Sequence, residues 1–413
     1  MKPEVLQHIS DLPVFTEMDD PAWGRDFYST YDELFAKRPE GLARLETGEV
    51  VAFTNADVGA LRTIPAVSHQ LLDDFLAPLA AEVELDGLKQ LFGPSTFVRR
   101  AAEHHPGKQL LSHVMSPRAV GGLRENLSAV IRDVLDTALS KDQVEFRTEV
   151  AVPILTGFWH DAIGLEPEET LEMMSYGELI NPSMHLSPTK DEIILADRAC
   201  ADWMAALPGY LKRGAKTDKY PLLNDLLLQF ASMGPDGRPD DPFMLLAPAL
   251  LDAFVTLAAV QTVVAHTLLD AEVQPADYRG VRGFAGNAFM ETLRLNNPVA
   301  MIGRETIEDI EYDGVHLPKG STLIMLWLVS GRDPAAYSNP NDFVLERNRA
   351  TQYSFGGGPY ICGGRNVARI VGETLLAEMA EGKITLERTG EATVGGDQAG
   401  RDVVALPVRL ARS

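Results

Sequence analysis

The sequence predicts a mainly α-helical protein with small β-sheets at its periphery. Between about residues 120 and 270, apolar side chains recur mostly with helical spacing, and this region ends in a long apolar segment, Phe243 to Leu269. Runs typical of strands are short and fall near the start of the chain and after about residue 305. No internal repeat and no long Gly/Ser/Pro-rich linker interrupts the chain. We therefore expect a single domain over residues 1–413.

Four peripheral strand regions are predicted from local turn or alternation signals. Residues 41–53 contain two short strands joined by a Thr-Gly turn. Residues 310–312 and 315–317 flank Asp313-Gly314, a dipeptide typical of tight hairpins. Further strands are expected over Ser321 to Trp327 and within the last thirty residues, as over residues 402–406.

The long apolar segment is predicted to be a buried core helix. Asp240-Asp241-Pro242 supplies a helix start, and the segment carries Gln261 and His266, which do not suit a membrane span. The first residues of the chain contain no apolar run typical of a signal peptide or an anchor. We expect no membrane anchor and a cytoplasmic location.

Composition excludes several classes of function. Lys and Arg total 37 against 59 Asp and Glu, a net charge of −22, which opposes nucleic-acid binding. The two cysteines, Cys200 and Cys362, are too few for a disulfide framework or a four-cysteine zinc site, and they fit a reducing compartment. An acidic protein that acts on a small molecule, and that we expect to be a monomer, fits this composition.

One loop, residues 355–369, packs five glycines around Cys362 and then turns into an apolar helical pattern. Glycines allow the backbone to approach a flat ligand closely, and a following helix N-terminus favours a thiolate. A phosphate loop is disfavoured because no Gly-Lys-Ser/Thr follows, and the dinucleotide spacing fails because Ile361 occupies the third glycine position. Cys362 is therefore a candidate metal ligand.

This loop resembles the haem-binding signature of the cytochrome P450 family, Phe-Gly-x-Gly-x-His/Arg-x-Cys-x-Gly followed by Ala and Arg. The resemblance implies the family's fold, a triangular prism with haem b (iron protoporphyrin IX) between the long central helix and the helix after the cysteine loop. It also implies Cys362 as the thiolate ligand of the iron. The matching residues are Phe355, Gly356, Gly358, Cys362, Gly364, Ala368 and Arg369.

The resemblance also assigns residues to the haem carboxylates. His104 and Lys108 on an early helix, and Arg304 further on, are implied as their cationic partners. The resemblance also implies that the haem contacts the loop residues Phe355, Gly356, Tyr360 and Gly364. Two departures predict a weaker hold on the haem: Tyr360 replaces the family's His or Arg, and Lys108 replaces its Arg.

A second match is Glu291-Thr292-Leu293-Arg294, which places a carboxylate and a guanidinium at i and i+3 on one helix face. It resembles the family's Glu-x-x-Arg. The resemblance implies a buried network, closed by Arg347, that orients the cysteine loop.

The central helix departs from the family's Ala/Gly-Gly-x-Asp/Glu-Thr, whose acid and alcohol relay protons during oxygen activation. Three registers place Thr256, Ala259 or Thr262 at the alcohol position, one helical turn apart on roughly one face. Ala259 is slightly favoured, and no register puts a carboxylate directly before the alcohol. We expect Asp252, on a similar face, to deliver protons or to bind substrate.

The resemblance implies a haem-thiolate monooxygenase of the soluble bacterial type. It would hydroxylate or otherwise oxidise a small, largely apolar organic molecule in a secondary-metabolite or catabolic pathway. Electrons would come from a ferredoxin or similar partner on the cysteine-loop side, where Arg365, Arg369, Lys108 and Arg100 predict a basic surface. The substrate pocket implied by the resemblance is mostly apolar: Phe97, Val98, Met184, Val299, Ala300, Met301 and Ile302.

Two alternatives would explain the missing acid. One is a haem-thiolate enzyme driven by peroxide or performing rearrangement, nitration or coupling. The other is a haem protein that binds ligands without catalysis. Turnover with peroxide and no reductase distinguishes the first, and failure to turn over any bound ligand supports the second.

Overall fold

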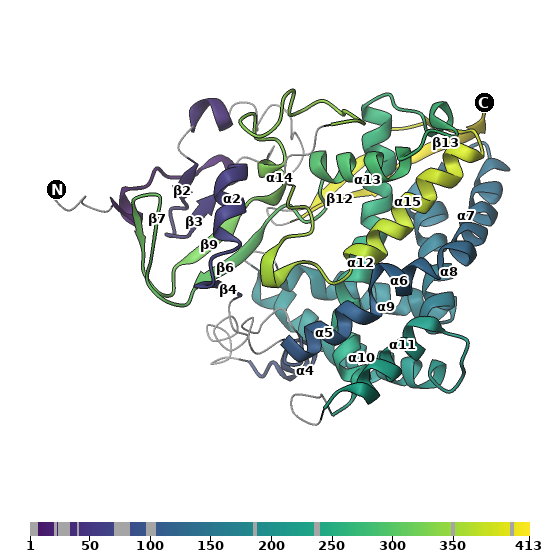
Figure 1. Cartoon of the computed structure of the whole chain (residues 1–413), viewed down its shortest axis with the longest axis horizontal. Coiled ribbons are helices and arrows are strands. Elements are labelled where there is room, and N and C mark those ends of the chain that lie inside the picture. Colours follow the sequence, from purple (N-terminus) through teal and green to yellow (C-terminus); the bar gives the residue numbers. More distant parts are fainter. Residues whose placement is uncertain are drawn as a thin grey trace. The chain divides into compact units, whose positions relative to one another are not determined.

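The computed structural model of the chain describes residues 7–19, 23, 34–38, 41–69, 83–95, 105–184, 188–234, 240–347, 352–396 and 400–413 (Figure 1). The chain divides into two compact units. Unit 1 comprises residues 1–70, 293–362 and 395–401, and unit 2 comprises residues 71–292, 363–394 and 402–413. The expectation of a single domain stays a prediction. Helices dominate the described residues and the sheets are small, which confirms the predicted fold class.

Unit 1 contains a five-stranded sheet in the order β2-β3-β9-β6-β4. The antiparallel pair β2 and β3 confirms the predicted first hairpin, and β3 then runs parallel to β9. The predicted strand from Ser321 to Trp327 is too long: β9 ends at Met325, and Trp327 begins α14, a short helix that ends at Ser330. The bounds of the strands are β2 Leu42–Arg44, β3 Val50–Ala52, β4 Val67–Ser68, β6 Ile302–Thr306 and β9 Thr322–Met325.

The second hairpin of unit 1 agrees with its sequence signal. Strands β7 (Ile310–Tyr312) and β8 (Val315–Leu317) are antiparallel, and β1 (Gln7–His8) adds to β8 in parallel. Asp313 and Gly314 have φ angles of 50° and 75°, the left-handed pair that a tight hairpin turn requires. The Asp-Gly prediction is confirmed.

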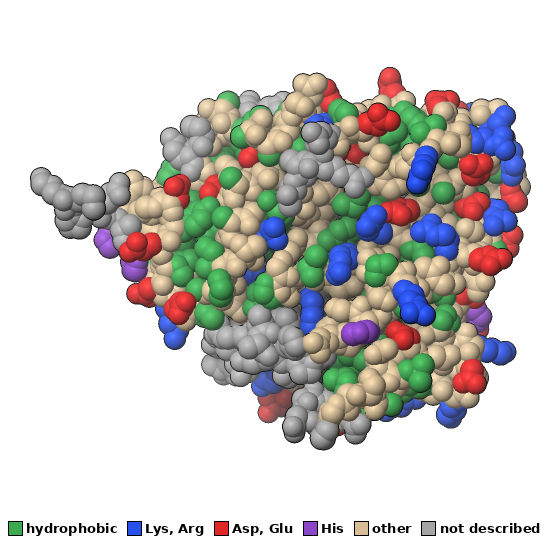
Figure 2. Space-filling view, in the orientation of Figure 1, with side chains coloured by type: hydrophobic (Ala, Val, Ile, Leu, Met, Phe, Trp, Pro, Cys, Tyr) green, Lys and Arg blue, Asp and Glu red, His purple; other side chains and the backbone are tan. Residues whose placement is uncertain are grey.

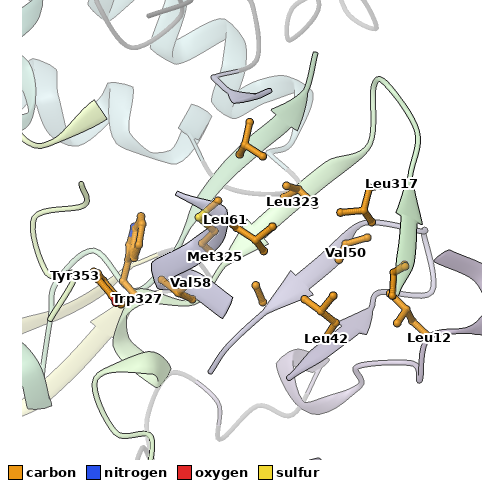
Figure 3. Packing of buried hydrophobic residues seen from close by; sticks show 13 residues of the cluster. Leu12, Leu42, Val50, Val58, Leu61, Leu317, Leu323, Met325, Trp327 and Tyr353 are labelled. Atoms are coloured by element: carbon orange, nitrogen blue, oxygen red, sulfur yellow. The ribbon is translucent and has the colours of Figure 1, made fainter. Parts of the chain in front are cut away.

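The core of unit 1 lies between these strands and helix α2 (Asn55–Leu61) (Figure 3). Its apolar side chains include Leu61, Leu323 and Met325, each no more than 1% exposed. Trp327 and Tyr353 lie next to one another at one end of the cluster, with ring centroids 6.2 Å apart. Tyr353 lies two residues before Phe355, the first residue of the glycine-rich loop, so this core fixes the point from which that loop begins.

Unit 2 is a bundle of helices with a small sheet, β10 (Ile384–Arg388), β13 (Pro407–Arg412) and β5 (Val144–Glu145). Helix α13 runs from Phe284 to Leu295, across the division between the units. The other helices are α4 Asp86–Phe92, α5 His105–Val114, α6 Pro117–Gly121, α7 Arg124–Leu139, α8 Val152–Ile163, α9 Pro167–Ile180, α10 Lys190–Gly214, α11 Pro221–Ser232, α12 Pro242–Asp270 and α15 Arg365–Glu381.

Helix α12 confirms the predicted central helix and packs against α8, α9, α10 and α15. Asp241 caps its start, since its Oδ1 accepts from the Phe243 amide at 2.9 Å. Phe254 stacks on Trp159 of α8 with centroids 5.1 Å apart, and Trp203 of α10 meets it edge-on at 5.6 Å. By length and composition α12 could cross a membrane, but 75% of its most apolar window is buried in protein, as in a core helix.

Candidate functional site

The loop that carries Cys362 begins at two fixed points in unit 1. The Tyr353 side chain lies in the core and is 7% exposed. At the next residue, Ser354 Oγ donates to the carbonyl of Leu293 at 3.1 Å, and the buried Asn297 side chain donates to the Ser354 carbonyl at 3.1 Å. Leu293 and Asn297 lie at the end of α13 and just after it. The last turn of that helix therefore holds the start of the loop.

The loop closes on itself through its backbone and presents Cys362 to solvent. The Cys362 amide donates to the Phe355 carbonyl at 2.9 Å, and the Gly356 amide donates to the Tyr353 carbonyl at 2.7 Å. Gly356 and Gly358 have φ angles of 67° and 60°, which L side chains rarely adopt, so glycine is required at both positions. The Cys362 side chain is exposed on this loop and is in no disulfide.

The other cysteine, Cys200, has the opposite environment. It is fully buried on α10, and burial raises the pKa of its thiol, with the Asp197 carboxylate adding to the effect. Such a thiol does not form a thiolate. Cys362 is exposed and lies three residues before Arg365, where α15 begins, so the helix N-terminus lies close to it in the chain. Cys362 is the better candidate for a metal ligand.

Arg62, at the end of α2, lies beneath the glycines of the loop. Its guanidinium is 4.6 Å from the centroid of the Tyr353 ring, and a side chain at Gly357 would overlap its Nη1. Sequence analysis missed Arg62. The sequence feature that could have pointed to Arg62 is Gly357. The haem-binding signature allows any residue at that position, and the packing of Arg62 explains why this chain has a glycine there.

Arg304 is a buried cation on β6, only 5% exposed, and burial lowers its pKa to about 10. Its Nη1 donates to the Gly303 carbonyl at 2.7 Å and to His69 Nδ1 at 3.3 Å. Among the described residues it has no carboxylate partner. A buried cation in this state is stabilised by an anion, and a haem carboxylate is such an anion. Arg304 therefore fits the group that the resemblance implies.

Tyr360 lies against the same guanidinium, whose Cζ is 5.1 Å from the ring centroid. The Tyr360 hydroxyl and Ser68 Oγ are 2.7 Å apart, and the His69 ring meets the Tyr360 ring edge-on with centroids 4.3 Å apart. Sequence analysis did not identify Ser68 or His69, and no local motif marks them.

The remaining predicted haem contacts fall in different places. Phe355 and Gly356 belong to the loop, and Gly364 is the residue before the first turn of α15. Lys108 is half-buried on α5 in unit 2, while Arg304 belongs to unit 1. His104 lies outside the described residues. These haem-contact assignments stay predictions.

The Glu-x-x-Arg pair lies on α13, with Glu291 5% and Arg294 1% exposed. The Arg294 guanidinium donates to the carbonyls of Gly331, Pro340 and Asp342 at 2.8, 2.6 and 2.9 Å. Arg347 donates to the same Asp342 carbonyl at 2.8 Å, so the two arginines meet on one backbone oxygen. Arg347 is half-exposed, in contrast to Arg294.

Two further residues complete this arrangement. Both guanidinium groups contact the Tyr337 ring, whose centroid is 5.1 Å from Arg294 Cζ and 5.9 Å from Arg347 Cζ. Arg332, 1% exposed, donates from Nε and Nη2 to the Leu295 carbonyl at the end of α13. Sequence analysis missed both residues because their contacts join segments of the chain that no local pattern connects.

The three registers of the central helix differ in exposure. Ala249, Ala253 and Thr256 are half-exposed and follow one face of α12. By contrast, Ala259 is 4% exposed, and Thr262 is fully buried with its hydroxyl donating to the Ala258 carbonyl of its own helix at 3.0 Å. The half-exposed face therefore ends at Thr256. The side chain of Asp252 lies outside the described part of the chain.

The predicted substrate residues also differ in exposure. Met184, in a short helix after α9, is 44% exposed, and Val299 is 40% exposed and bridges to Gly400. Met301 is buried at 5%, and Ile302, half-buried, begins β6. Ala300 offers its carbonyl to the Leu328 amide. Phe97 and Val98 lie outside the described residues.

Comparison with known proteins gives a consistent result. Residues 284–380 match a family model described as cytochrome P450. Over 314 residues the chain is 24% identical to a cytochrome P450 of Rhodopseudomonas palustris, covering 74% of each chain. It is 27% identical to the erythromycin C-12 hydroxylase of Saccharopolyspora erythraea, covering 70% of this chain and 73% of that protein. The solved structure of P450BioI with an acylated acyl carrier protein covers 93% of this chain and 98% of its own at 18% identity, with a TM-score of 0.81. The predicted fold is confirmed.

Proposed function

The chain belongs to the cytochrome P450 family, and from this premise we propose that it hydroxylates or similarly oxidises a small, largely apolar organic molecule with electrons from a ferredoxin or similar protein. The family's cofactor is haem b and its members are oxidoreductases. The observation that carries the proposal is the exposed Cys362 on a loop that the core and α13 hold rigid. The hydroxylase named among the relatives supports hydroxylation as the reaction.

The residues of the chain that would hold the haem follow from the site. Cys362 Sγ would bind the iron, Arg304 would bind a carboxylate, and the glycines of the loop would let the backbone approach the flat ring. When bound, the haem would supply the activation of oxygen, and the protein would supply the thiolate ligand, the orientation and the exclusion of water. The expected cytoplasmic location and monomeric state stay predictions.

Oxygen transfer gives a direct test of this function. The holoenzyme, a ferredoxin, its reductase and NADPH would be incubated with apolar compounds that change the haem spectrum, under isotopically labelled dioxygen. One labelled oxygen atom in the product supports monooxygenation. Product formed only with peroxide, or product without label, would instead support the atypical chemistries and overturn the proposal.

Within this function we assign the oxygen-side hydroxyl to Thr256. It is the last residue of the half-exposed face of α12, whereas the hydroxyl of Thr262 is buried and bonded to its own helix. Only a hydroxyl that reaches open space can pass a proton to a bound ligand. Asp252, one turn earlier, stays a predicted proton donor.

Thr256→Ala is expected to lower the product formed per NADPH consumed by roughly tenfold, because the proton relay loses its alcohol. Thr262→Ala is the matched control, since it removes a hydroxyl from the same helix without removing one that faces open space. We expect it to keep the wild-type yield. Product and NADPH measured in the same reaction decide the outcome. Equal yields from wild type and Thr256→Ala would contradict the assignment.

The partner surface that we propose is a basic face of unit 2, formed by Arg118, Arg124, Arg365 and Arg369. These side chains are exposed or half-exposed on α6, α7 and α15, and both α6 and α7 pack against α15. In Figure 2, Lys and Arg side chains gather over the part of the molecule where α6 and α15 lie in Figure 1. A local basic face on a chain of net charge −22 suits an acidic partner.

Sequence analysis predicted Arg365 and Arg369 for this face but missed Arg118 and Arg124. Arg369 is paired with Glu373 at 2.9 Å, and Arg124 donates to Thr374 at 3.1 Å. Arg100, also predicted, lies outside the described residues. Arg118 on α6 and Arg365 at the start of α15 belong to two different helices of this face, and we choose them as the targets for a test.

We expect the double variant Arg118→Glu, Arg365→Glu to slow reduction of the haem by ferredoxin about tenfold at low salt, and by less at high salt. Arg198→Glu, an exposed arginine on α10, changes the net charge without touching the face and serves as the control. Stopped-flow absorbance measures the rate. If Arg198→Glu slowed haem reduction equally, net charge alone would explain the effect. If the double variant reduced the haem at the wild-type rate, this face would not be the docking surface of the ferredoxin.

A further inference from the structure

We propose that His69 binds one haem carboxylate together with Arg304, and that Tyr360 positions both side chains. In this chain His69 would then supply a hydrogen-bond donor in place of the cation that the family has at the position of Tyr360. The inference rests on the cofactor of the family and not on the substrate or the reaction proposed above.

The register of the sheet brings the two residues together. Strand β4 is antiparallel to β6, with Val67 opposite Thr306 and Ser68 opposite Glu305. The next residue, His69, therefore emerges beside Arg304, and Arg304 Nη1 lies 3.3 Å from His69 Nδ1. About 235 residues of sequence separate the two side chains, so only the sheet makes them neighbours.

The protonation of His69 follows from its partner. A guanidinium can only donate, so His69 Nδ1 accepts and the ring proton is on Nε2. Nε2–H is the group of the imidazole that would donate to a haem carboxylate. Arg304 uses only Nη1 toward the described residues, which leaves donors at Nε and Nη2. The pair can present several N–H groups to one carboxylate, and burial of the guanidinium makes that anion strongly stabilising.

Tyr360 fixes the geometry of this pair without adding charge. Its hydroxyl is held at 2.7 Å from Ser68 Oγ, which sets the plane of the ring. The guanidinium lies over the ring, 5.1 Å from its centroid, and the imidazole meets the ring edge-on at 4.3 Å. Tyr360 contacts both candidate ligands, and for this reason we assign it as a positioning residue.

The test is the rate at which the ferric holoprotein loses haem to a haem-free acceptor globin, without substrate or electron donor. His69→Phe keeps an aromatic ring beside Tyr360 but removes the donor, and we expect haem loss about tenfold faster, as for one charge-assisted hydrogen bond. Tyr360→Phe, which removes the hydroxyl that contacts Ser68 Oγ, is expected to accelerate loss by about threefold. His316→Phe on β8 is the control and should match wild type.

Haem dimethyl ester distinguishes binding of a carboxylate from a purely structural role. The ester lacks the anionic groups, so wild type and His69→Phe should lose it at the same rate if His69 acts through a carboxylate. If His69→Phe loses both natural haem and the ester tenfold faster, the substitution has disturbed packing and not a bond to a carboxylate. If it loses natural haem at the wild-type rate, His69 does not contribute to holding the haem. Either result overturns the inference. Neither result depends on turnover, so failure of the proposed reaction would be seen separately.

Discussion

Replacing Cys362 with serine is expected to abolish the spectral band of the reduced, carbon-monoxide-bound protein that marks a thiolate ligand, and to lower turnover by several orders of magnitude. A serine hydroxyl stays protonated at neutral pH and is a poor donor to iron, so the haem would lose the thiolate ligand on which its oxygen chemistry would depend. The fold should survive. The Cys362 side chain is exposed, and the hydrogen bond to the Phe355 carbonyl comes from the backbone amide, which serine keeps.

Cys200→Ser is the matched control for this variant. It makes the same chemical change at a fully buried position, so it should cost about 1–3 kcal/mol of stability by burying a hydroxyl and yet keep the thiolate band. Absorption spectra of both reduced variants under carbon monoxide, with thermal unfolding of each, separate ligation from stability. A retained thiolate band in Cys362→Ser would refute the ligand assignment.

The features that the sequence predicted correctly are those that depend on neighbours in the chain. The Asp313-Gly314 hairpin forms because both residues tolerate the left-handed conformation, and that requirement is local. The start of α12 at Pro242 follows from the cap at Asp241 in the same way. The loop around Cys362 was recognisable in part because its own backbone requires glycine at positions 356 and 358.

The features that the sequence did not reveal depend on contacts between distant segments. His69 and Arg62 precede the loop by about 290 residues, and neither belongs to a motif. Their roles arise from a strand register and from the end of a short helix, both of which tertiary structure decides. Trp327 is a similar case, because the sequence pattern continued the strand that the structure ends at Met325.

The register of α12 shows a different limit. Periodicity predicts one face, since Thr256, Ala259 and Thr262 follow one another by single turns. It could not tell which part of that face the neighbouring helices cover. The similarity of residues 258–262 to the family's motif favoured Thr262, whose hydroxyl donates to a carbonyl of its own helix. The exposure of the side chains favours Thr256.

Arg294→Ala is expected to destabilise the protein by roughly 4 kcal/mol and to accelerate loss of haem. The buried guanidinium satisfies three backbone carbonyls, of Gly331, Pro340 and Asp342, and a methyl group would leave all three without that donor. The effect should reach the cysteine loop because Arg294 lies beside Leu293, whose carbonyl accepts from Ser354. Unfolding in urea, followed by circular dichroism, measures the change.

Arg347→Ala provides the comparison that separates burial from charge. Arg347 shares the Asp342 carbonyl and the Tyr337 ring with Arg294, but it is half-exposed, so water can replace its hydrogen bonds to Ser338, Asn339 and Asp342. We expect a loss of about 1 kcal/mol and near-normal retention of haem. Equal losses in the free energy of unfolding would show that charge at both positions stabilises the network. Burial of the Arg294 guanidinium would then not explain its contribution to stability.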